Sequence, residues 1–194
     1  MTLIYSDEQA AMAIEARRAL EARTRPGALL ALLEQEGCYD APSWTLAREQ
    51  GWTAAVLPEE YGGLGLSLVE LGLIAFETGR VLAGAPFLTT SLGAGRAILR
   101  HGTAEMKAAW LPGLASGEAI GAVAFAEGQD VLGLSTTLAD GALTGGKQGV
   151  SGAVHADIAV VLAGEGGEPV LVAVELAGAA LAGVARTTLA TFDN

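Results

Sequence analysis

The sequence has few of the residues on which disulfides, metal sites and nucleophilic catalysis depend. Its 194 residues include one cysteine, Cys38, and two histidines, His101 and His155. A single cysteine cannot form an intramolecular disulfide, and neither histidine has other ligand residues at metal-binding spacing. The G-x-S-x-G, G-x-x-x-x-G-K-[ST] and G-x-G-x-x-G motifs are absent too. We therefore expect no metal site and no catalytic side chain, so that any chemistry depends on a bound cofactor or on residues outside this sequence.

Basic residues and long apolar runs are scarce as well. Eleven Lys and Arg residues stand against 22 Asp and Glu residues, and the formal net charge of −11 argues against a nucleic-acid partner. The longest apolar stretch, residues 169–185, contains Glu175, whereas a membrane-spanning helix needs about 20 predominantly apolar residues. The start of the chain lacks a basic segment followed by an apolar one. We expect no membrane span and a cytoplasmic location.

Helical signals dominate the first half of the chain. Ser6 with Gln9, and Ser67 with Glu70, have the spacing of a capping box, in which the two side chains bond to each other's backbone N–H groups. Pro112 and the glycines near it are expected to end the last helix. The predicted helices cover residues 6–23, 28–36, 41–50, 67–81, 88–100 and 103–111.

The second half reads as short apolar runs separated by glycines, which is typical of β-strands. The predicted strands cover residues 120–125, 134–139, 143–150, 158–163, 170–174 and 189–192. Helices followed by strands indicate an α+β protein with segregated domains. We predict an all-helical bundle domain at residues 1–117 and a small β-barrel-like domain at residues 118–194.

Three phrases in the helical half identify a family. Residues 51–65, GWTAAVLPEEYGGLG, resemble the phrase G-W-x-x-x-x-x-P-E-E-Y-G-G-x-G of the acyl-CoA dehydrogenase family. Residues 70–80 resemble the helix that follows it, and residues 109–118 resemble the phrase that leads into the β domain. The resemblance implies the family's N-terminal helical domain and most of its middle β domain. The family's C-terminal four-helix domain, which carries the catalytic glutamate, is not represented.

One phrase of the β half resembles a flavin-contacting segment of the family. Family members read A-x-T-E-P-x-x-G-S-D where the first β-strand passes the flavin, and residues 124–130 read AFAEGQD. Ala126 replaces the threonine, Gln129 replaces the serine, and about three loop residues are missing. The resemblance places this segment beside FAD with fewer hydroxyl donors.

A second phrase of the β half resembles the other side of the flavin site. The family's N-G-x-K-x-W-I-T-N-G corresponds to residues 145–152, in which Lys147 matches. Gly149 stands at the aromatic position beside the flavin ring, and Ser151 stands at the threonine that can bond it. The resemblance therefore implies five FAD-contacting residues: Phe125, Ala126, Gln129, Gly149 and Ser151.

The family resemblance implies α,β-dehydrogenation of an acyl-CoA thioester, in which FAD accepts the electrons and passes them to an electron-transfer flavoprotein. We expect a homo- or hetero-oligomer, and we expect this chain alone to be inactive. A second hypothesis is a non-catalytic companion subunit of a heteromeric acyl-CoA dehydrogenase that has lost its own flavin site. A third is a flavin monooxygenase or a nitroalkane-oxidase-like relative on the same fold.

Several other residues have a structural interpretation that is favoured over a functional one. Small residues at 83–87 and 91–95 give room for a bulky acyl group or, as the favoured interpretation, let helices pack closely. His155 is expected to be structural or exposed. Adjacent Glu59 and Glu60 are expected in a solvated loop.

Overall fold

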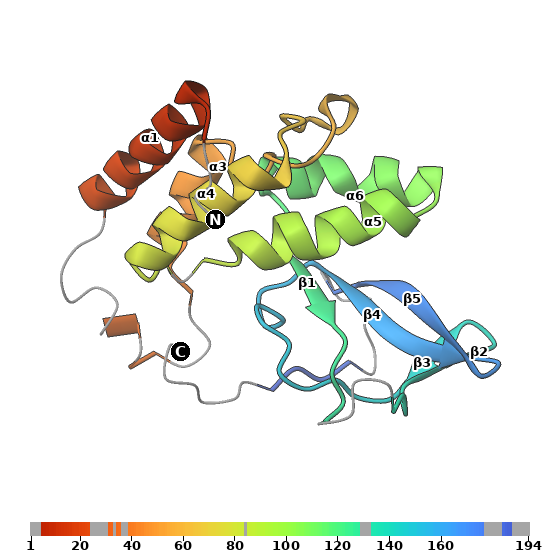
Figure 1. Ribbon diagram of the computed structural model, residues 1–194. Coiled ribbons are helices and arrows are strands. Elements are labelled where there is room, and N and C mark those ends of the chain that lie inside the picture. Colours follow the sequence, from red (N-terminus) through yellow and green to blue (C-terminus); the bar gives the residue numbers. More distant parts are fainter. Residues whose placement is uncertain are drawn as a thin grey trace.

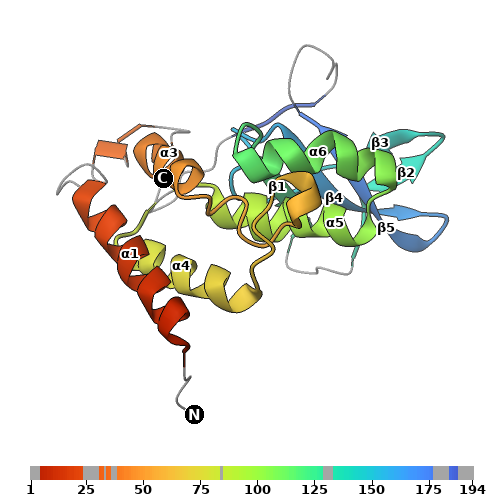
Figure 2. The ribbon, with the colours of Figure 1, turned by 90° about the horizontal axis from the view of Figure 1, so that it is seen from above.

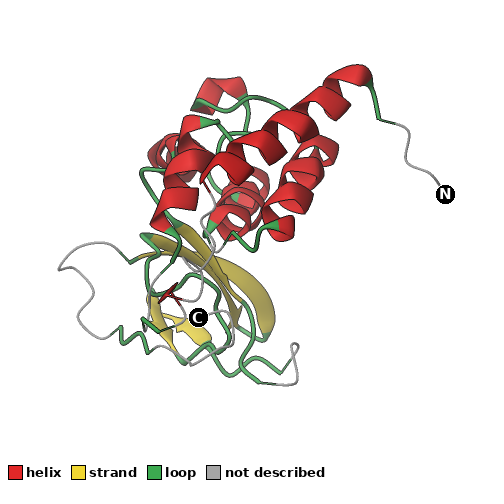
Figure 3. Cartoon of the chain, turned by 90° about the vertical axis from the view of Figure 1, so that its left-hand side faces the viewer, coloured by secondary structure: helices red, strands yellow, loops and turns green. Residues whose placement is uncertain are grey.

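Helices and strands occupy separate layers of the molecule, with the helices first in the chain (Figures 1 and 3). The computed structural model describes residues 5–23, 31–32, 34–35, 39–83, 85–128, 133–176 and 184–187. The predicted α+β class is confirmed. Most of the predicted helix at 28–36 and all of the predicted strand at 189–192 lie outside the described residues. The helical elements are α1 (Asp7–Arg23), α3 (Ala41–Glu49), the 3-10 helix η1 (Glu59–Tyr61), α4 (Leu68–Arg80), the π-helical segment η2 (Thr89–Gly95), α5 (Arg96–His101) and α6 (Ala104–Ser116).

Both predicted capping boxes are confirmed. The Gln9 N–H donates to the Ser6 hydroxyl oxygen at 3.2 Å, and the Ser6 N–H donates to the Gln9 side chain at 3.0 Å. At α4 the Ser67 oxygen accepts from the Val69 N–H at 3.1 Å, and Glu70 accepts from the Ser67 N–H at 2.9 Å. These bonds satisfy N–H groups that have no partner within the helix, and they explain why α1 and α4 begin where the sequence predicts.

Helices α1 and α4 lie side by side and run in the same direction (Figure 2). Gln9 donates to Glu70 at 2.7 Å near the starts of the two helices, and Arg17 donates twice to Glu77, at 2.8 and 2.9 Å, about two turns further along. The Glu77 side chain is only 3% exposed. The hydrogen bond from Arg17 lowers the pKa of Glu77 in spite of this burial, so its carboxylate stays ionised between the helices.

The prediction that α6 ends at Pro112 is wrong. The helix continues through Pro112 to Ser116 and ends at Gly117, which adopts the left-handed conformation (φ 69°). Proline removes one helical hydrogen bond, but the carbonyl that loses it belongs to Ala108, on an exposed part of the helix. Leu111 and Leu114, on either side of Pro112, are fully buried. Their burial favours continuation of the helix over the break.

The predicted helix at 88–100 is present, but it begins as the π-helical η2 and becomes α5 only at Arg96. η2 lies against the first strand, where a Cβ on Gly93 would come within 2.6 Å of Val123 and one on Gly121 within 2.5 Å of Ala94. The Gly121 N–H donates to the buried Thr90 hydroxyl at 3.1 Å. Small residues at these positions therefore allow close packing of helix on strand, as the favoured interpretation of residues 91–95 predicted.

The β layer is a five-stranded mixed sheet arranged around its longest strands. β4 pairs in parallel with β1 over Ile158–Val161, meets β2 at Gly164, and pairs antiparallel with β5 along its length; β2 pairs antiparallel with β3. The strands are β1 (Gly121–Ala124), β2 (Thr137–Ala139), β3 (Ala142–Thr144), β4 (Ile158–Glu165) and β5 (Glu168–Glu175).

The strand predicted at 143–150 ends already at Thr144. Gly145 (φ 143°) and Gly149 (φ 62°) follow in conformations that interrupt an extended strand, so residues 145–150 form a loop. This difference matters because the loop carries the second phrase that resembles a flavin segment.

A shared apolar core joins the two layers. Side chains from the helical region meet side chains from β4 in one buried cluster. Its largest members are Leu57, Ile98, Leu111, Leu114, Ile158 and Val160. The sheet is therefore held against the helices by burial as well as by the contact between η2 and β1.

Candidate functional site

Two loops that follow strand ends carry the residues predicted to contact FAD. Phe125 and Ala126 come directly after β1, while Gly149 and Ser151 lie between β3 and β4. Gln129 lies outside the described residues.

Hydrogen bonds bring these two loops together. The Gln148 N–H donates to the Ala126 carbonyl at 2.8 Å, and the Lys147 ammonium donates to the Phe125 carbonyl at 3.2 Å. The Lys147 ammonium also forms an ion pair with Glu127. Residues that lie 20 to 22 positions apart in the sequence therefore form one local structure.

Glu127 is the centre of this structure, and the sequence did not reveal that role. Its carboxylate accepts from the Lys147 ammonium, from the Ser135 N–H at 2.6 Å and hydroxyl, and from the Thr136 N–H at 3.0 Å. The side chains of Glu127 and Lys147 are only 6% and 8% exposed. The hydrogen bond from Lys147, followed by those from Ser135 and Thr136, holds the pKa of Glu127 far below its usual range. Glu127 is thus a permanently ionised anchor and is unsuited to act as a general base near neutral pH. In the sequence, the one sign of this pair was Lys147, which matches the lysine of the family phrase. A lysine whose ammonium is buried needs an anionic partner.

The residues present fit one edge of a flavin. Ser151 is exposed, and its hydroxyl makes no hydrogen bond with another described residue. A Cβ at Gly149 would meet no atom within 4 Å, so the space directly above this position is open. Phe125, whose carbonyl accepts from Lys147 in the same pair of loops, is 38% exposed. These features supply a hydroxyl partner and open space for a planar ring, although Gly149 itself provides no stacking surface.

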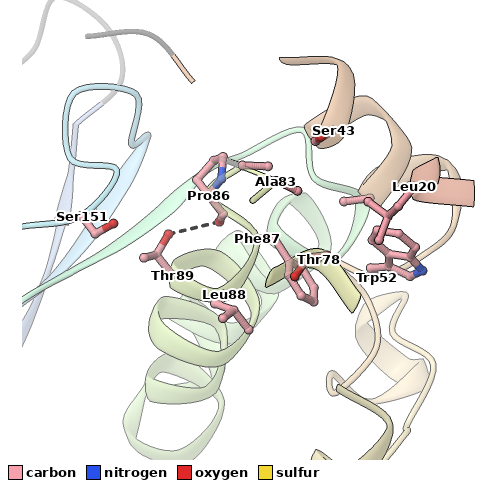
Figure 4. Close-up of a pocket in the computed structure, with 12 residues that line it drawn as sticks. Leu20, Ser43, Trp52, Thr78, Ala83, Pro86, Phe87, Leu88, Thr89 and Ser151 are labelled. Carbon is pink, nitrogen blue, oxygen red and sulfur yellow. Dashed lines mark hydrogen bonds between the residues drawn. The ribbon is translucent and has the colours of Figure 1, made fainter. Parts of the chain in front are cut away.

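A pocket of about 220 Å³ extends from Ser151 into the helical region (Figure 4). Its walls come from α1, α3, the end of α4 and the segment that connects α4 to η2. Four hydroxyl residues line it: Ser43, Thr78, Thr89 and Ser151. The apolar lining residues are Leu20, Ala47, Trp52, Ala83, Ala85, Pro86, Phe87 and Leu88.

The hydroxyls along the pocket are mostly occupied as donors. Thr89 donates to the Pro86 carbonyl at 3.1 Å, Thr78 donates to the Ala75 carbonyl at 2.8 Å, and Ser43 donates to Asp40. The interior is therefore largely apolar, and the lining hydroxyl that bonds no other described residue is that of the exposed Ser151 at the β side. The small residues Ala83 and Ala85 line this pocket, whereas Gly93 and Ala94 allow the close packing of η2 on β1.

The other residues singled out in the sequence have structural positions. The His155 ring packs edge-on against Tyr39 at a centroid distance of 4.6 Å and is half-buried, while Glu59 and Glu60 are exposed as expected but lie in the 3-10 helix η1. The part of the chain that the structure describes contains no cluster of three potential metal ligands. Among those same residues no helix is long and apolar enough to cross a membrane.

Comparison with known proteins places the chain in a family. The sequence profile described as "Acyl-CoA dehydrogenase, N-terminal domain" matches residues 6–118, and the chain belongs to the acyl-CoA dehydrogenase family. A "Probable acyl-CoA dehydrogenase" of Bacillus subtilis (strain 168) is 39% identical over 127 residues, which are 60% of this chain and 21% of that protein.

Solved structures show the same fold. The ChsE4-ChsE5 complex from Mycobacterium tuberculosis superposes with a TM-score of 0.86 at 25% identity, over 98% of this chain and 52% of that one. An acyl-CoA dehydrogenase complexed with FAD from Bacillus anthracis superposes with a TM-score of 0.72 at 33% identity, over 88% of this chain and 31% of that one. The chain thus spans from a fifth to about half of the length of these relatives.

Proposed function

We propose that this chain forms the helical and β parts of an FAD-dependent acyl-CoA dehydrogenase that catalyses α,β-dehydrogenation of an acyl-CoA thioester. The observation that carries this proposal is the pocket, which runs from Ser151 at the proposed flavin edge to the apolar interior of the helical region. A thioester whose acyl chain lies in the pocket has its reacting carbons near the β-side mouth, where FAD supplies the oxidation when bound.

The residues of this chain would bind and orient. The Ser151 hydroxyl would hydrogen-bond the flavin edge, and Phe125 and Ala126 would form the adjoining wall, with Gln129 a further proposed contact. The apolar lining would exclude water from the acyl chain. A cavity of about 150 Å³ is known to hold benzene, so a pocket of about 220 Å³ has room for a small apolar part of an acyl group.

Purification of the protein in its native assembly from the cells that produce it tests this function. The expected preparation is yellow, and its flavin absorption bleaches when the acyl-CoA substrate is added without an electron acceptor. A normally folded preparation that contains no flavin and takes up none would contradict the proposal.

A variant that fills the pocket tests the acyl site. Ala85→Leu adds three carbons to the lining, and we expect about tenfold weaker binding of the longest acyl-CoA that the protein accepts. Ala108→Leu, at an exposed position of α6, is the control and should leave binding unchanged. Equal binding by both variants would place the acyl chain elsewhere.

A second candidate function is a companion subunit whose flavin site has been lost. Ala126 has no hydroxyl and Gly149 has no ring, and one structural relative is described as a complex of two named proteins. Flavin counting in a purified hetero-oligomer separates the two functions. One flavin for every subunit would exclude the companion role, whereas one flavin for every two subunits would support it.

The domain division, the assembly, the electron acceptor and the place of the catalytic base are proposed from the family resemblance. We infer a division into residues 1–117 and 118–194, which the profile match to residues 6–118 supports. We also infer a homo- or hetero-oligomer in the cytoplasm that passes electrons to an electron-transfer flavoprotein. The catalytic base is proposed to lie outside this chain.

A further inference from the structure

The Glu127–Lys147 ion pair lies where the sheet no longer holds the chain. The pairing of β1 with β4 ends at Ala124, and β3 ends at Thr144. Beyond these points, the bonds that the structure shows between the two loops are those made by Lys147 and Gln148 to residues 125–127. The position of residues 125–127 relative to residues 147–151 therefore depends on the bonds of Lys147 and Gln148.

We propose that Glu127 and Lys147 are positioning residues that fix the Phe125–Ala126 segment relative to the Gly149–Ser151 segment, and so set the shape of the flavin edge. This inference rests on the proposed function. Neither side chain needs to touch the flavin. Lys147 bonds the Phe125 carbonyl and Glu127 together, and Glu127 in turn holds the Ser135 and Thr136 amides.

The chemistry of the pair suits this role. Both side chains are almost wholly buried, so loss of one partner leaves the other charge poorly solvated and makes it move toward water. Movement of Lys147 would release the Phe125 carbonyl and displace Gly149, only two residues further along the chain. A displacement of about 1 Å at a binding site is enough to change binding or rate strongly.

The experiment compares two buried carboxylates. Glu127→Gln and Lys147→Met break the proposed contact, and Lys147→Arg keeps a positive donor. Glu77→Gln is the matched control, because Glu77 is an equally buried, ion-paired carboxylate between α1 and α4. Two quantities are measured on the protein in its native assembly: the hydrogen-exchange rate of residues 125–127 and 147–151, and the dissociation constant of FAD after reconstitution.

We expect Glu127→Gln and Lys147→Met to speed exchange in both segments and to weaken FAD binding about tenfold or more. Lys147→Arg should keep the exchange rates and the FAD affinity much closer to wild type than Lys147→Met does. Glu77→Gln should lower thermal stability without faster exchange in these segments and without weaker FAD binding. Unchanged exchange in Glu127→Gln would overturn the inference, as would equal FAD affinities in Glu127→Gln and Glu77→Gln. Wild-type protein that binds no FAD would contradict the proposed function instead, and the exchange rates would then decide alone whether the pair positions the two loops.

Discussion

The helical region and the loops at the strand ends are ordered by different kinds of interaction. In the helical region, caps act over two or three residues, as at Ser67, and a common apolar core packs the helices. In the loops, exposed residues are held by the Glu127–Lys147 ion pair and by the bonds that Lys147 and Gln148 donate to the Phe125 and Ala126 carbonyls. The scaffold is thus specified locally and redundantly, while the shape of the proposed flavin edge depends on few long-range bonds.

This contrast teaches where substitutions can be tolerated. The glycines of the family phrase at residues 51–65 have conformational or steric tasks in the fold: Gly51, Gly62 and Gly65 adopt positive φ, and Gly63 lies against the Leu57 carbonyl. In the loops an added Cβ at Gly146 or Gly149 would meet no atom within 4 Å, although the φ of 62° at Gly149 still favours glycine, whereas Gly145 packs closely against Thr136. Four changes probe the contrast, from the largest expected effect to the smallest.

Gly63→Ala compares the two regions directly. A Cβ at Gly63 would lie 1.9 Å from the Leu57 carbonyl oxygen, so the backbone must move. We expect a loss of about 3 kcal/mol in the free energy of unfolding, measured by urea denaturation. The control Gly146→Ala, where a Cβ meets no atom within 4 Å, should stay within about 0.5 kcal/mol of wild type. Similar losses in both variants would refute the contrast.

Thr90→Val tests the contact between the layers. The variant keeps the shape of the side chain but leaves the buried Gly121 N–H without the hydroxyl to which it donates. A loss of about 2 kcal/mol is expected in the same assay. Thr144→Val, at an exposed position of β3, serves as the control and should be nearly neutral. A neutral Thr90→Val would mean that packing alone joins η2 to β1.

Ser67→Ala tests the local signals. It removes the oxygen that accepts from the Val69 N–H at the start of α4. The expected loss is about 1 kcal/mol by thermal or urea unfolding. Ser151→Ala should leave stability unchanged, because its exposed hydroxyl bonds no described residue. An equal effect of the two serines would contradict the assignment of one to the scaffold and the other to binding.

The smallest effect concerns pH. Hydrogen bonds from Ser67, and next from Gln9, lower the pKa of Glu70 to about 2. A glutamate titrates at about 4.3 when unfolded, so its stabilisation is complete above that pH and is lost as the pH falls toward about 2. The stability difference between wild type and Glu70→Gln should be below about 1 kcal/mol near pH 6, since the side chain is partly exposed, and should shrink between pH 5 and 2. A difference that stays constant over that range would show that the charge of Glu70 has no part in it.

Local features of the fold could be predicted from the sequence, and long-range features could not. Both capping boxes were predicted because each involves residues three positions apart. The prediction that the helix ends at Pro112 was wrong because the burial of Leu111 and Leu114 outweighs the lost hydrogen bond. That burial depends on tertiary packing, which the local sequence does not show. The pairing of Glu127 with Lys147 was missed for the same reason, since no local pattern links them. The predicted flavin contacts came from the family resemblance, and they are still predictions.

The π-helical η2 has a consequence for how this chain can change in length. A π-helix carries one more residue per turn than the α-helical path requires, and each residue of an α-helix turns the chain by about 100°. Deletion of one residue between Thr89 and Gly95 would let the segment become α-helical while α5 keeps its orientation toward the core. Deletion of one residue within α6, which is regular, would instead turn one part of that helix by about 100° relative to the other. The π-helical segment is therefore the place in the helical region where the chain can lose one residue with the least disturbance of the helix that follows.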